Sequence, residues 1–240
     1  MNRKLTPTPR PVFVRTLYAS AILLLGAPAV QASTCELSAG GTGSTSGTGA
    51  NSIGCGHFNI ANGAGSAAVG NSNNSSGTNS SSIGFGNVSS GGNSSAVGYD
   101  NDATGLFSNA FGSSSQATAD RATSIGVSNI ASGAESTATG YSNLAQGERS
   151  SAVGHDNSAT AIDSSALGRG SNATGDRSTA VGYDNAASGS NSSAVGSGNV
   201  ATQLFSNAFG SSSQATADRA TSIGVSNIAS GAESTATGYS

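Results

Sequence analysis

Every fourteenth residue is a glycine along most of this 240-residue chain, and this period constrains the possible folds more than any other feature. Ala or Ser stands two places before each glycine, and Val, Ile, Leu, Phe or Thr stands directly before it. A disordered chain, which an abundance of Gly, Ser and Asn would otherwise indicate, does not keep such a register. The glycines are Gly70, Gly84, Gly98, Gly112, Gly126, Gly140, Gly154, Gly168, Gly182, Gly196, Gly210, Gly224 and Gly238, with Gly54 as an outlying member that precedes the series out of register.

The period divides into two equal halves, each with enough residues for a short strand and a tight turn. We therefore expect an all-β fold, a narrow parallel β-solenoid in which each repeat forms one coil. Glycine is expected at the turns, where φ is positive or two backbones come close. Because neighbouring strand residues point to opposite faces, small residues half a coil apart are expected to fill the interior. These are Ala96, Ala103, Ala131, Ala152, Ala159, Ala180, Ala187 and Ala194.

The residues that precede the glycines are expected to point outward from one wall of the solenoid, in a column with a spacing of about 4.8 Å. The larger members are Val69, Ile83, Val97, Phe111, Ile125, Val153, Leu167, Val181, Val195, Phe209 and Ile223, and we call them the apolar column. An apolar strip about 60 Å long is unusual on a soluble monomer and indicates packing between identical chains. The opposite facing, with Val inward and Ala outward, remains open. The other wall carries mainly Thr and Ser, such as Thr104, Thr160 and Thr174.

Two further patterns keep the same register. At equivalent places after successive glycines come Arg121, Glu135, Arg149, Asp163 and Arg177, so stacked coils would place opposite charges next to each other. Residues 106–142 recur without change at 204–240, an offset of seven repeats. Each copy of this segment begins with two apolar residues at a turn position that is polar in most other repeats. They are either a contact patch for a partner or a contact between protomers. These are Leu106, Phe107, Leu204 and Phe205.

The N-terminal region differs from the array. Basic residues precede the apolar run 17–25, and the small residues at 30–32 suit cleavage, so we expect residues 1–32 to be a secretory signal peptide. Residues 33–50 are expected to be a Gly/Ser/Thr-rich linker and residues 51–240 the repeat array. Export permits a disulfide between Cys35 and Cys55, but free thiols or links between chains remain open.

The composition argues against several functions. Without residues 1–32 the chain keeps five arginines, no lysine and twelve acids, a net charge of about −7, so we expect no nucleic-acid binding. His155 stands at a variable position and no fixed carboxylate pair accompanies it, so we expect no enzyme activity, no cofactor and no metal site. The Thr/Ser column keeps one alternative open, a secreted solenoid that binds ice or another repetitive surface.

The repeat resembles the head repeat of the trimeric autotransporter adhesins, the YadA-like head or Hep/Hag haemagglutinin repeat. The motifs that carry the resemblance are Ser94–Gly98, Ser150–Gly154, Ser178–Gly182 and Ser192–Gly196. The resemblance implies a left-handed parallel β-roll, a side-by-side homotrimer and display on the surface of a Gram-negative bacterium. It also implies attachment to host extracellular matrix proteins, cells or abiotic surfaces, or self-aggregation. The 240 residues contain no heptad stalk and no membrane-anchoring β-segments, so we expect anchoring only through a C-terminal region outside this chain, and secretion if the chain is complete.

Overall fold

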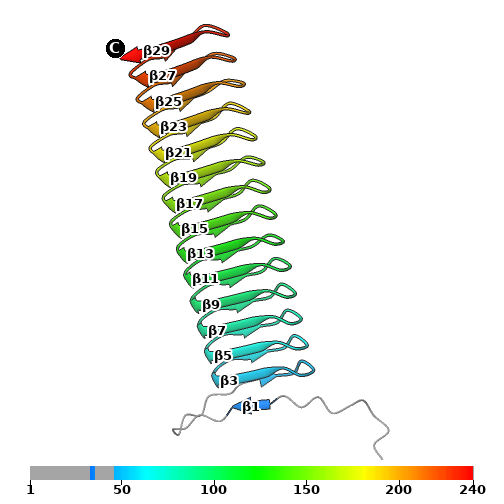
Figure 1. Ribbon diagram of the computed structural model, residues 1–240. Coiled ribbons are helices and arrows are strands. Elements are labelled where there is room, and N and C mark those ends of the chain that lie inside the picture. The colour runs from blue at the N-terminus through cyan, green and yellow to red at the C-terminus, as the bar shows by residue number, and fades with distance from the viewer. Residues whose placement is uncertain (1–32, 36–45, 240) are drawn as a thin grey trace, which may run out of the picture.

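The chain forms a rod-shaped parallel β-solenoid (Figure 1). The computed structural model describes residues 33–35 and 46–239, and these contain β-strands and no helix. The expected all-β parallel solenoid is therefore confirmed, whereas the left-handed sense and the trimer stay predictions. No helix that could span a membrane occurs among these residues. The predicted signal peptide, 1–32, lies outside them.

One wall of the rod is a 15-stranded parallel sheet, made of a short strand at the N-terminal end and fourteen longer strands of equal length. Its strands are β1 (Ser33–Cys35), β3 (Ile53–His57), β5 (Ala67–Asn71), β7 (Ser81–Phe85), β9 (Ser95–Tyr99), β11 (Asn109–Ser113), β13 (Thr123–Val127), β15 (Thr137–Tyr141), β17 (Ser151–His155), β19 (Ser165–Arg169), β21 (Thr179–Tyr183), β23 (Ser193–Ser197), β25 (Asn207–Ser211), β27 (Thr221–Val225) and β29 (Thr235–Tyr239). We call this wall the long-strand sheet.

The other wall is a 14-stranded parallel sheet of two-residue strands, the short-strand sheet. Its strands are β2 (Ser46–Gly47), β4 (Ile60–Ala61), β6 (Asn74–Ser75), β8 (Val88–Ser89), β10 (Asp102–Ala103), β12 (Gln116–Ala117), β14 (Ile130–Ala131), β16 (Leu144–Ala145), β18 (Ser158–Ala159), β20 (Asn172–Ala173), β22 (Ala186–Ala187), β24 (Val200–Ala201), β26 (Gln214–Ala215) and β28 (Ile228–Ala229).

From β3 onward, each long strand pairs with the next long strand in the sequence, and the register stacks equivalent residues directly, as Gly84 on Gly98. At the N-terminal end Gly56, not Gly54, pairs with Gly70, so the regular period extends one coil further than the sequence indicated. Strand β2 pairs with β4, so the array also reaches into the segment expected to be a linker. Strands β1 and β3 pair with Cys35 opposite Cys55, which brings the backbones of the two cysteines side by side.

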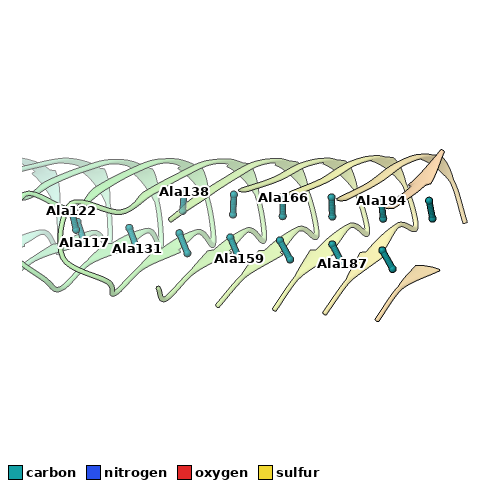
Figure 2. Packing of buried hydrophobic residues seen from close by; sticks show 14 of the residues in the cluster. Ala117, Ala122, Ala131, Ala138, Ala159, Ala166, Ala187 and Ala194 are labelled. Carbon is teal, nitrogen blue, oxygen red and sulfur yellow. The ribbon is translucent and has the colours of Figure 1, made fainter. Parts of the chain in front are cut away.

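The interior row between the two sheets holds only small side chains among the described residues. All eight of the interior alanines named above have no exposed surface. Alanines of the two sheets point toward each other across the narrow interior, such as Ala138 from the long-strand sheet and Ala131 from the short-strand sheet (Figure 2). Buried serines take the place of alanine in some coils, such as Ser82 and Ser124 in the long-strand sheet and Ser89 in the short-strand sheet. The space between the two sheets leaves no room for a larger side chain in this row.

Buried asparagines form a second interior row, which we call the asparagine ladder. Its members with no more than 8% exposed surface are Asn59, Asn73, Asn87, Asn101, Asn129, Asn143, Asn157, Asn185, Asn199 and Asn227. Each of them follows a left-handed residue of a turn, for example Asn101 after Asp100 with φ of 54°. The sequence predicts a turn at these asparagines, but it does not indicate that their side chains point inward.

Asn143 shows how the ladder satisfies buried backbone groups. Its Nδ2 donates to the carbonyl oxygens of Thr139, at 3.0 Å, and Gly154, at 2.8 Å, and to Oδ1 of Asn129, at 3.0 Å. Its own Oδ1 accepts from the backbone N–H of Asn157, at 3.1 Å. Serine replaces asparagine in three coils, and there a hydroxyl takes over one bond, as Ser115 Oγ donates to Gly126 O at 3.1 Å.

The repeat glycines lie inside the long strands rather than at the turns. Each is the fourth residue of its strand, and φ at the thirteen positions lies between 115° and 130°. A Cβ on Gly154 would collide with the carbonyl oxygen of Gly168 in the next coil. Glycine is therefore required both by the positive φ and by the close approach of successive coils.

Replacing Gly154 by alanine is expected to destabilise the rod by about 1–3 kcal/mol, because the backbone of the next coil would have to shift. Gly198→Ala is the matched control. Gly198 also has positive φ, 64°, but a Cβ there would lie 3.7 Å from Ser212 Oγ, its nearest contact. It should cost only about 1 kcal/mol, the lower end of the penalty for a left-handed residue with a side chain. Thermal unfolding followed by circular dichroism measures both, and equal losses would contradict the close-approach argument.

Replacing Asn143 by leucine is expected to cost several kcal/mol, since each buried polar group left without a partner costs about 1–3 kcal/mol. Asn143→Ser should cost less, because serine already stands between two asparagines at Ser115. Urea unfolding of the two variants tests the ladder. Similar midpoints would show that its side-chain hydrogen bonds contribute little to stability.

Candidate interaction surface

The outer face of the long-strand sheet carries the apolar column at the third position of each strand. Val97, Phe111 and Ile125 are successive register partners in β9, β11 and β13. Ile83, Ile125, Leu167 and Ile223 are exposed, between 37% and 44%, and the other seven members are half-buried. The column is interrupted by Thr139, which lies between Ile125 and Val153. The face is therefore a partly exposed apolar strip along the rod.

Aromatic and basic side chains form a neighbouring column at the fifth position of the long strands. Phe85 and Tyr99 stack with ring centroids 5.3 Å apart, and Tyr141 and His155 stack at 4.9 Å. The guanidinium of Arg169 lies 5.6 Å from the ring centroid of Tyr183. In the sequence, His155 stands out only as a residue at a variable position, although the regular period could have identified these stacked pairs.

The short-strand wall is more polar. The Thr column follows its strands, and Thr104, Thr118 and Thr174 are exposed. Apolar residues interrupt this polarity at the outward position of the short strands, where Ile130 and Ile228 are exposed. The Thr column itself also contains Ser132, Gln146 and Ser188, so it is not a uniform ladder.

The turns that follow the short strands β10 and β24 carry the duplicated apolar residues. Leu106, Phe107, Leu204 and Phe205 have exposed fractions between 42% and 48%. Both phenylalanines adopt left-handed backbone conformations, with φ of 58° and 57°. Asparagine, which tolerates this region better than a bulky residue, fills the equivalent position at Asn79, Asn93 and Asn191.

Charged side chains lie at the same turn in the coils between the two patches. Arg121 pairs with Glu135 at 3.3 Å, and Arg149 Nε donates to Asp163 Oδ1 at 2.6 Å. Arg149 also contacts Glu148. The hydrogen bond from Arg149 lowers the pKa of the Asp163 carboxyl below its ordinary value. The Arg121–Glu135 and Arg149–Asp163 pairs each join residues one coil apart, as the alternating signs in the sequence indicated, and exposed pairs of this kind stabilise little.

Within the described part of the chain, no three His, Cys, Asp or Glu side chains gather in a group that could hold a metal ion.

Comparison with known families gives a match over most of the chain. The YadA head domain repeat, described as two copies, matches residues 75–101, 103–129, 131–157, 159–185, 187–213, 208–224 and 215–240. This chain belongs to the YadA head family. No curated protein matched the chain.

The five longer YadA head matches begin at positions 75, 103, 131, 159 and 187, so each covers two coils of the solenoid. The coils between Ser46 and the first match have the same strand order and pairing. The family comprises surface-exposed heads of trimeric autotransporter adhesins, and these are structural proteins rather than known enzymes.

Proposed function

We propose that this chain is exported and forms the head of a trimeric surface adhesin that attaches to host extracellular matrix, cells or abiotic surfaces, or aggregates with its own kind. The partly exposed apolar column carries the proposal, because it requires a covering partner along the whole rod. Membership of the YadA head family supports three identical chains as that cover. Repetition then supplies adhesion by avidity, since many weak contacts act together along a rigid trimer.

Replacing Val153 and Val181 by aspartate is expected to prevent trimer formation, because buried unpaired carboxylates would face one another in the interface. Sedimentation equilibrium of the purified chain should show trimers for the parent and single chains for the variant. A matched control places aspartate at Thr160 and Thr174 on the other wall and should leave the trimer intact. Trimers of the Val153/Val181 variant would show that the apolar column is not the interface.

Adhesion itself is tested by binding of the purified chain to immobilised matrix proteins and cells. Trimers that bind none of these and do not aggregate would contradict the adhesin function.

The exposed Thr104, Thr118 and Thr174 support a second candidate, binding to ice or another repetitive surface. Inhibition of ice recrystallisation by the purified chain would favour ice binding, and uninhibited crystal growth would exclude it.

A further inference from the structure

Two identical apolar patches lie on one edge of the rod, seven coils apart. Each pairs an exposed leucine with an exposed phenylalanine, Leu106 with Phe107 and Leu204 with Phe205. Seven coils of a parallel β-solenoid span about 34 Å. Both phenylalanines also keep a backbone conformation that suits asparagine better. An exposed ring and a strained backbone each cost free energy. A contact that buries the ring would offset both costs.

The turn residues between the patches complete what we call the turn edge: Phe107, Arg121, Glu135, Arg149, Asp163, Arg177, Asn191 and Phe205. If two such edges met in parallel and in register, every charge would face its own kind. Arg149 would face Arg149 and Asp163 would face Asp163. Like charges directly opposite one another are unfavourable.

An antiparallel meeting that places Phe107 on Phe205 gives the opposite result. The two patches are an odd number of coils apart, so the midpoint between them falls between the coils of Arg149 and Asp163. Arg149 of one chain then faces Asp163 of the second copy, and Glu135 faces Arg177. No like charges face each other along the turn edge, and the two phenylalanine contacts form at its ends.

We propose that the turn edge docks antiparallel on the turn edge of a second copy of this chain, about a two-fold axis between Arg149 and Asp163. Such a contact is isologous and closes on itself. The charges select the direction and the register, and the phenylalanines supply most of the affinity. The proposal rests on the proposed function, because it names the surface through which such heads would associate with one another.

The first test is self-association of the purified chain with Phe107→Asn and Phe205→Asn. Asparagine already occupies the equivalent turns at Asn93 and Asn191, so the variant should unfold at no lower temperature than the parent. Velocity sedimentation should show that the parent doubles the mass of its assembled unit and that the variant associates about tenfold or more weakly. Phe58→Asn is the control, because Phe58 is an exposed left-handed aromatic at the opposite turn. Unchanged association of the Phe107/Phe205 variant, or no association of the parent, would overturn the proposal.

The second test reads the direction of pairing by disulfide formation, in chains whose Cys35 and Cys55 are replaced by serine. Arg121→Cys and Asn191→Cys are introduced into separately tagged chains. Because residue 121 of one chain faces residue 191 of the second copy, mild oxidation should link the two tags only in the mixture. Dimers of the Arg121→Cys chain alone would indicate parallel edges and overturn the proposal.

The two proposals fail separately. Trimers that never pair would refute the docking of the turn edge and leave the trimeric head intact. Single chains that pair through Phe107 and Phe205 would refute the trimer and leave the docking intact.

Discussion

The structure depends on the stacking of each coil on the next, equivalent coil, close enough for continuous backbone hydrogen bonding. That spacing brings the carbonyl of one repeat glycine against the α-carbon of the previous one, so a side chain is excluded there. It also makes every column of the rod a row of near neighbours. Stability then comes from backbone bonds and the asparagine ladder, because alanine and serine in the interior bury little apolar surface.

Much of this structure could be predicted from the sequence, because residues one period apart become neighbours when equivalent coils stack directly. The interior position of Ala96 and Ala103 and the pairing of Arg149 with Asp163 both follow from the regular period and the alternation of strand residues. The asparagine ladder could not be predicted in the same way. Positive φ at Gly98 and Asp100 breaks the alternation at the turn, so counting along the strand no longer tells where Asn101 points. The repeat glycines were expected at turns because positive φ and close backbone approach are common there, but here both conditions occur within the strands.

The division between interior and exterior places the variable chemistry of the rod on its outside. Interior positions accept only Ala, Ser, Asn or Gly, whereas outward positions vary freely from coil to coil, as Val97, Phe111 and Thr139 do in one column. The fold therefore presents long surfaces whose chemistry changes in steps of one coil. Recognition by such surfaces is distributed, and its strength grows with the number of coils and of chains that act together.

Duplication of whole coils also determines which residues lie at which distance on the surface of the array. Only an insertion of complete repeats keeps the asparagine ladder and the glycine contacts continuous, and the duplication of residues 106–142 at 204–240 meets this condition. Because charges on the turn edge alternate, the number of coils between two copied patches decides which charges face each other when the edges meet antiparallel. An odd number, as here, opposes Arg149 to Asp163. One additional charged coil between the patches would move the midpoint onto a coil and set like charges opposite one another, although the fold of every coil would be unchanged.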